Sequence, residues 1–178
     1  MVTEPRWLDA REQQAWRSFL AATRLLSAQL DRELQRDAGI PHAYYEILVV
    51  LSETPGRSMR MSELADITES SRSRLSHAVA RLEEAGWVRR DSCATDRRGQ
   101  FAVLTDKGFE ALSAAAPGHV EAVRTHLFDR LTSEQVDQLE AICTAIIDGL
   151  RDTAPPHPWT VQGAPADGHT DEACPEAS

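Results

Sequence analysis

The sequence has little lysine, little cysteine and no long apolar run. Of its 19 basic residues only Lys107 is a lysine, and its three cysteines, Cys93, Cys143 and Cys174, form no Cys-x-x-Cys pair and no disulfide framework. No apolar stretch approaches the ~18–20 residues of a membrane span, and the first residues lack the basic start and apolar stretch of a secretory signal. We therefore expect a protein of the reducing cytoplasm with no membrane partner.

The sequence also lacks the motifs of catalysis and metal binding. It has no paired-carboxylate motif and no phosphate loop, and the serine-rich segment ESSRSRLS is not a strand-to-helix nucleophile elbow. His119 and His126 are seven residues apart, about 10 Å along a helix, so one ion cannot easily bridge both. We expect neither an enzyme, nor a cofactor, nor a metal site.

The net charge of −9 at first argues against a nucleic-acid partner, because neutralising phosphates takes a surplus of basic side chains. The charge is unevenly distributed, however. Residues 1–104 are balanced, and the whole deficit lies in residues 105–178. Residues 71–98 contain seven arginines and four acids. The whole-chain sum therefore hides a local basic strip.

Periodicity and turn residues predict a mainly helical chain with a small hairpin. The expected helices cover residues 9–37, 41–53, 62–67, 71–85, 106 to about 127, and 132–151. An extended piece is expected at residues 58–61, and two strands at 87–91 and 100–104. Residues 152–178 are rich in proline and acids and have no basic side chain, a composition that predicts a disordered tail.

This order of elements predicts a winged helix-turn-helix, whose second helix enters the major groove of DNA. In residues 71–85, Leu75, Val79 and Leu82 recur at i, i+4 and i+7 and should face the core. The outer face is basic and rich in short hydrogen-bonding groups. We predict DNA contacts from this helix and from the tip of the wing, by Ser71, Arg72, Ser73, Arg74, His77, Arg81, Arg97 and Arg98.

Other interpretations of this basic segment remain open. Arg81 could pair with Glu84, three residues further along the helix. Arg89 and Arg90 are interpreted as strand residues that flank the hairpin, with phosphate contact as the alternative. Cys93 has arginines nearby that would stabilise a thiolate.

Three stretches together resemble the MarR family of bacterial transcription regulators: MSELADITESSRSRLSHAVARLEEAGWVRR, TDRRGQFAVLTDKGFEAL and LTSEQVDQLEAI. The resemblance runs from about Trp7 to Arg151. It implies a homodimer that binds a pseudo-palindromic operator in double-stranded DNA, most often as a repressor. It divides the chain into a helical dimerisation region (7–38 and 106–151), a winged helix-turn-helix (41–105) and the tail (152–178).

Many members of the family release DNA when a small aromatic or lipophilic molecule enters the cleft between the dimerisation region and the winged helix-turn-helix. The resemblance places Trp16, His42, Tyr44 and Tyr45 where such an effector pocket lies, although core or dimer packing is an alternative for each of them. Redox-sensing members use a cysteine near the start of the chain, which this sequence lacks. A different class of function keeps the fold without sequence-specific DNA binding: a winged-helix adaptor that binds proteins through its acidic half.

Overall fold

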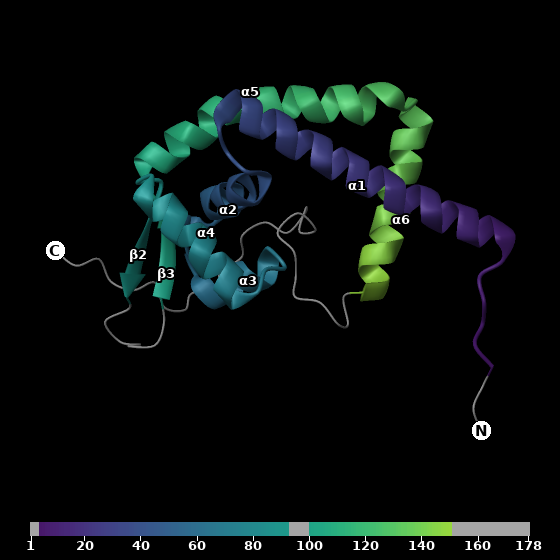
Figure 1. Cartoon of the computed structure of the whole chain (residues 1–178), viewed down its shortest axis with the longest axis horizontal. Helices are drawn as coiled ribbons and strands as arrows, with labels where there is room; N and C mark the ends of the chain where they lie inside the picture. The colour runs from purple at the N-terminus through teal and green to yellow at the C-terminus, as the bar shows by residue number, and fades with distance from the viewer. Residues whose placement is uncertain (1–3, 93–99, 151–178) are drawn as a thin grey trace.

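The computed structural model describes residues 4–92 and 100–150. Within these ranges the chain is mainly helical, with a small sheet at one end (Figure 1). The elements follow one another as α1 (Ala10–Ala38), α2 (His42–Glu53), η1 (Pro55–Arg57), β1 (Ser58–Arg60), α3 (Met61–Ile67), α4 (Arg72–Glu84), β2 (Val88–Ser92), β3 (Gln100–Leu104), α5 (Asp106–His126), η2 (Phe128–Arg130) and α6 (Ser133–Leu150). This order confirms the predicted winged helix-turn-helix between flanking helices. The predictions for Cys93, the wing tip and the tail lie outside the described residues.

Local side-chain contacts begin and end the long helices where the sequence predicts. At the start of α1, the backbone N–H of Glu12 donates to Asp9 Oδ1 (2.8 Å), and that of Asp9 donates to Glu12 Oε2 (2.9 Å). Gly39 ends the helix with φ 68°, a conformation that glycine adopts without strain. Thr132 and Gln135 exchange two similar bonds at the start of α6. Each of these side-chain caps joins residues three apart, which is why sequence alone locates them.

The three strands form one antiparallel sheet in the order β1-β3-β2. Val88 of β2 lies opposite Leu104 of β3 at the base of the predicted hairpin. On the other edge of β3, Met59 of β1 lies opposite Ala102. The sequence predicted that residues 58–61 are extended, but not which strand they join, because that pairing brings together residues more than 40 positions apart.

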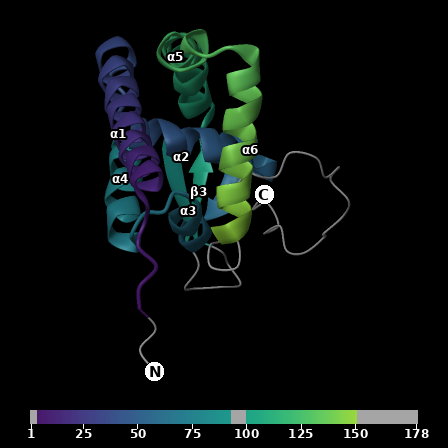
Figure 2. The ribbon, with the colours of Figure 1, turned by 90° about the vertical axis from the view of Figure 1, so that its right-hand side faces the viewer.

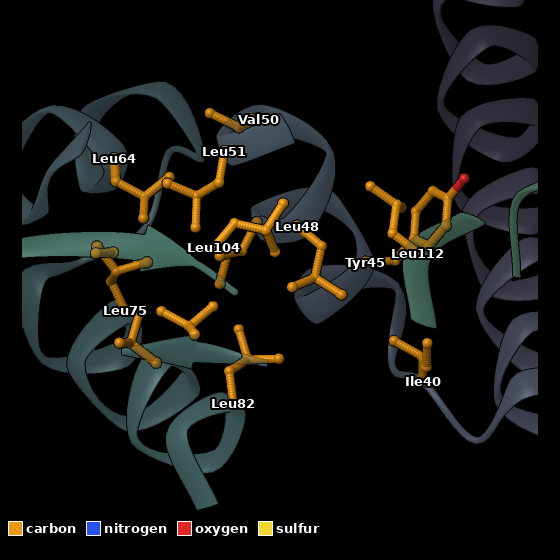
Figure 3. Close-up of a cluster of buried hydrophobic side chains, with 14 of the residues drawn as sticks. Ile40, Tyr45, Leu48, Val50, Leu51, Leu64, Leu75, Leu82, Leu104 and Leu112 are labelled. Atoms are coloured by element: carbon orange, nitrogen blue, oxygen red, sulfur yellow. The ribbon is translucent and has the colours of Figure 1, made fainter. Parts of the chain in front are cut away.

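One apolar core lies between the sheet and helices α2, α3 and α4 (Figure 3). The predicted stripe of α4, formed by Leu75, Val79 and Leu82, is at most 1% exposed. Leu48 and Leu51 of α2 are fully buried in the same core. Burying an aliphatic side chain of this size stabilises the fold by about 1.5–3 kcal/mol. The stripe therefore fixes which face of α4 points inward and which remains outside.

Helix α1 lies beside α5 over its second half only (Figures 1 and 2). Leu30 and Leu34 are buried there, and His126 Nε2 of α5 lies 2.8 Å from Glu33 Oε1. The first half of α1 is exposed, including Trp16 and Phe19. Helix α6 buries none of its residues. Two helices therefore present apolar side chains that the single chain leaves uncovered.

The start of α5 is fixed against the end of α4 by a close contact between backbones. A Cβ atom added to Gly108 would lie 2.1 Å from the carbonyl oxygen of Trp87. The hydroxyl of Thr105 donates to the carbonyl of Gly86 (2.8 Å), and Lys107 Nζ donates to the carbonyl of Ala85 (2.8 Å). We call these six residues the α4–α5 joint. The segment LTDKG, which the resemblance singled out, thus joins α5 to the end of α4.

We expect Gly108→Ala to destabilise the fold, because the new methyl group meets backbone that cannot swing aside. Overpacking of this kind costs about 1–3 kcal/mol, and we expect the upper part of that range. Gly118→Ala is the matched control in the same helix: no atom lies within 4 Å of its added Cβ. Alanine there should be neutral or stabilising by up to about 1 kcal/mol. Chemical denaturation at one protein concentration measures both, and equal effects would contradict the close contact.

Candidate nucleic-acid interface

The first turn of α4 lies at the surface. The hydroxyl oxygen of Ser71 accepts a hydrogen bond from the backbone N–H of Arg74 (3.3 Å) and caps the helix, as the sequence predicts. The residues predicted to contact DNA from this end of α4 are all exposed: Ser71, Arg72, Ser73, Arg74 and His77. Because the opposite stripe is buried, these side chains are held outward by a helix that cannot rotate.

The two arginines in this turn differ from Arg81 at the other end of α4. Within residues 4–92 and 100–150, neither Arg72 nor Arg74 forms an ion pair with a carboxylate. Arg81, in contrast, lies with Nη1 2.8 Å from Glu84 Oε2, and this hydrogen bond raises the pKa of its guanidinium. The pairing of Arg81 that the sequence offered as an alternative is therefore present. The first turn of α4 also adds the positive end of the helix dipole.

Strand β2 contains two arginines that bind the protein itself. Arg89 lies 2.9 Å from Asp91 on the same strand, and Arg90 lies 3.2 Å from Glu83 of α4. Both contacts agree with the interpretation of these arginines as structural. Arg97 and Arg98 belong to residues 93–99, outside the described part, so their predicted contacts stay predictions.

A second group of polar side chains lies between α1, α2 and α5. The ring of His119 lies 4.7 Å from that of Tyr45 and 5.5 Å from that of His42, between ring centroids. His119 Nδ1 is buried and has no hydrogen-bond partner among the described residues. Burial, and secondarily the charge of His42, lowers the pKa of His119. His119 is thus a half-buried imidazole whose neutral form the fold favours.

His119 also lines a cavity between α1 and α5. The other lining residues come from the same two helices: Leu30, Glu33, Leu34, Asp37, Ala38, Ala114, Ala115, Gly118 and Ala122. None of the four residues predicted for an effector pocket is among them, although His42 and Tyr45 contact His119. Trp16 lies on the exposed half of α1, where its ring stacks on Phe19 at 6.2 Å. The structure therefore brings together two of the four predicted residues and leaves Trp16 apart from them.

The described part of the chain has neither a metal-binding cluster nor a membrane-spanning helix. No group of three or more histidine, cysteine, aspartate or glutamate side chains in residues 4–92 and 100–150 could hold a metal ion. No helix in that part of the chain is long and apolar enough to cross a membrane.

Comparison with known proteins bears on this arrangement directly. Residues 38–99 match the sequence pattern of the MarR family. Sco3205, a MarR family transcriptional regulator from Streptomyces coelicolor whose crystal structure was solved in complex with DNA, is 58% identical to this chain. The two superpose with a TM-score of 0.79 over 85% of this chain and 94% of Sco3205. This chain belongs to the MarR family of transcriptional regulators.

Two further relatives are similar to this chain. AbsC, a MarR family regulator from the same organism, is 48% identical, with a TM-score of 0.76 over 84% of this chain and all of AbsC. The transcriptional regulator HosA of Escherichia coli is 31% identical over 91 residues, which span 51% of this chain and 65% of HosA. Membership in the MarR family confirms the predicted fold and the prediction of a regulator rather than an enzyme.

We expect His119→Phe to weaken the dependence of stability on pH. Because the folded chain lowers the pKa of His119, the unfolded chain binds that proton more readily, and the parent loses stability as pH falls through the ordinary range of histidine, from about 7 to about 5. Phenylalanine keeps the ring against Tyr45 and removes the proton site. Melting temperatures across that range should fall less for the variant than for the parent. If the melting temperatures of variant and parent fall equally with pH, another titrating group causes the pH dependence.

Proposed function

We propose that this chain is a homodimeric transcription regulator that binds a pseudo-palindromic operator, with α4 of each protomer in the major groove. The observation that carries the proposal is the exposed first turn of α4. There Arg72 and Arg74 have no carboxylate partner in the described residues, while the opposite stripe is fixed in the core. The complex of the relative Sco3205 with DNA supports the same partner for this chain.

The chemistry of this turn suits both the bases and the backbone of DNA. An arginine fork can bond to N7 and O6 of guanine, the most common specific contact in the major groove. The hydroxyls of Ser71 and Ser73, together with the positive end of the helix, suit phosphate oxygens. His77 follows one turn later, where it can donate to a base edge or a phosphate. Arg97 and Arg98 are proposed to reach the minor groove from the wing.

The uncovered apolar faces of α1 and α6 support a dimer. Trp16 is 51% exposed, Phe19 45%, Ile142 56% and Ile146 45%. Contiguous apolar surface of this kind on a soluble chain marks a protein–protein contact. We propose that these faces cover each other in the homodimer, which sets the spacing of the two α4 helices on the duplex at about 34–36 Å.

We propose that the regulator represses a nearby operon and that a small aromatic or lipophilic molecule relieves the repression. Support for an effector comes from the position of His42, Tyr45 and His119, where α5 passes from the winged region to the helices of the dimer. A ligand that displaced α5 there would also move α4, because the α4–α5 joint connects the two helices.

We expect Arg74→Ala to weaken operator binding by about tenfold or more, since one good contact to a base is worth about 1–3 kcal/mol. The operator is first obtained by selecting bound sequences from random duplex DNA. Arg124→Ala is the matched control: it removes the same charge from an exposed arginine of α5, which pairs with Asp129. The Arg124→Ala variant should bind the operator with nearly the affinity of the parent in titrations at fixed salt. A parent that does not bind duplex at 50 mM salt would instead favour the adaptor.

We expect Ile146→Asp to yield monomers at concentrations where the parent is a dimer, because a carboxylate would be buried in the apolar contact. Thr144→Asp is the matched control, since it places the same charge on the opposite, exposed face of α6. Light scattering during size-exclusion chromatography measures both masses. A dimeric Ile146→Asp variant would contradict the role of α6.

A further inference from the structure

One arginine connects the recognition helix to the wing. Arg90 of β2 reaches back to α4, where its Nη2 donates to the carbonyl oxygen of Ser76 (2.7 Å) and lies 3.4 Å from the Ser76 hydroxyl. Its backbone N–H donates to Glu83 Oε1 (3.0 Å), and its Nε lies 3.2 Å from Glu83 Oε2. Ser76 and Glu83 are seven residues apart on α4, about 10 Å along its axis. A single residue of the wing strand is thus bonded to the helix at two points two turns apart.

These contacts hold a part of β2 that the apolar core does not reach. Val88, at the start of the strand, is 2% exposed, but Asp91 and Ser92 are exposed. Between them, the side chains of Arg90 and Glu83 are only 25% and 32% exposed. Solvent and salt screen such a pair less than a fully exposed one. The polar contacts of Arg90 therefore replace apolar packing where β2 leaves the core and leads into the wing.

The neighbouring ion pairs lack this arrangement. Arg89 pairs with Asp91 within β2, with side chains 56% and 47% exposed. Arg81 pairs with Glu84 within α4, with side chains 68% and 65% exposed. Each of these pairs joins two residues of one element and cannot set the placement of one element against another. Of these three pairs, only that of Arg90 spans helix and strand.

We propose that Arg90 is a positioning residue for DNA binding: through Glu83 and Ser76 it fixes β2 against α4, so that wing and recognition helix meet the duplex in one relative placement. The proposal rests on the proposed function, and it assigns Arg90 a role without contact to DNA. The side chain of Arg90 donates to the carbonyl of Ser76 through Nη2, at the end of a planar fork whose direction a lysine ammonium does not reproduce.

The substitution Glu83→Ala distinguishes this positioning role from a direct contact between Arg90 and a DNA phosphate. If Arg90 touched phosphate, Glu83→Ala would release it and remove a negative charge from the interface, and binding would tighten. If Arg90 positions the wing, the same change loosens β2 and operator binding weakens. The two accounts therefore predict opposite signs. The helix should tolerate the substitution, because an acidic side chain near a helix C-terminus is unfavourable and alanine is the best helix former.

The experiment compares matched variants of the full chain by titration with the selected operator and with random duplex at the same salt. Glu83→Ala is paired with Glu84→Ala, which removes the same charge one residue away. Arg90→Lys is paired with Arg89→Lys, and both keep the positive charge. We expect operator affinity to fall about tenfold for Glu83→Ala and for Arg90→Lys, the equivalent of one lost contact. The control Arg89→Lys should stay within about twofold of the parent, and Glu84→Ala, which releases Arg81, should bind no more weakly than the parent. Affinity for random duplex, which depends on total charge, should not fall.

The double variant Glu83→Ala/Arg90→Lys should bind the operator more weakly than either single variant but by less than the product of the two effects, because the changes share the ion pair between Glu83 and Arg90 and each also removes a bond of its own. Thermal melting checks that every variant is folded. The inference is overturned if Glu83→Ala binds the operator as tightly as Glu84→Ala, or if Arg90→Lys binds as tightly as Arg89→Lys. If either of these results is found while the parent protein still binds its operator, the role of Arg90 is wrong and the proposed function stands. If the parent binds no duplex at all, both the role of Arg90 and the proposed function are wrong.

Discussion

The burial of one stripe of α4 is the constraint on which the proposed interface depends. Leu75, Val79 and Leu82 are almost completely buried against α2 and the sheet, and each contributes about 1.5–3 kcal/mol to the fold. Rotating α4 to present another face would expose all three at once. The first turn therefore stays outward without any contact of its own to hold it. The α4–α5 joint fixes the other end of the helix, so that α4 is held along its side and at its C-terminus while its N-terminus is free to meet a ligand.

The packing of α4 and β2 also determines which arginines of the basic strip, residues 71–98, form ion pairs. Three acids of residues 71–98 pair with arginines of that segment: Glu83 with Arg90, Glu84 with Arg81, and Asp91 with Arg89. The acids lie at the end of α4 and on β2, so they neutralise the arginines there. What remains in the described part of the strip is the pair of arginines in the first turn of α4. The net charge of −9 reflects residues 105–178 and gives no account of this surface.

The helices outside the winged region leave apolar surface uncovered. Half of α1 and the length of α6 carry apolar side chains that the single chain does not cover. Exposed apolar faces of this kind mark a contact with another protein. In the homodimer that we propose, the second copy covers both faces. Helix α5 is common to both regions: it begins at the α4–α5 joint and ends at the hydrogen-bond contact between His126 and Glu33 of α1. In the homodimer that we propose, a change in the arrangement of the two copies can therefore reach α4 through one helix.

The sequence by itself determined the features that depend on neighbours within about one turn of helix. The caps at Asp9, Ser71 and Thr132, the ends of the helices and the buried stripe of α4 follow from residues three or four positions apart. Three sequence stretches, taken together, were enough to indicate the family. Only the tertiary structure decided the pairing of β1 with β3, the meeting of His119 with His42 and Tyr45, and the two-point contact of Arg90 with α4. These contacts join side chains on different elements. Spacing along the chain carries no information about which of several arginines a given glutamate will face once the core has set the elements in place.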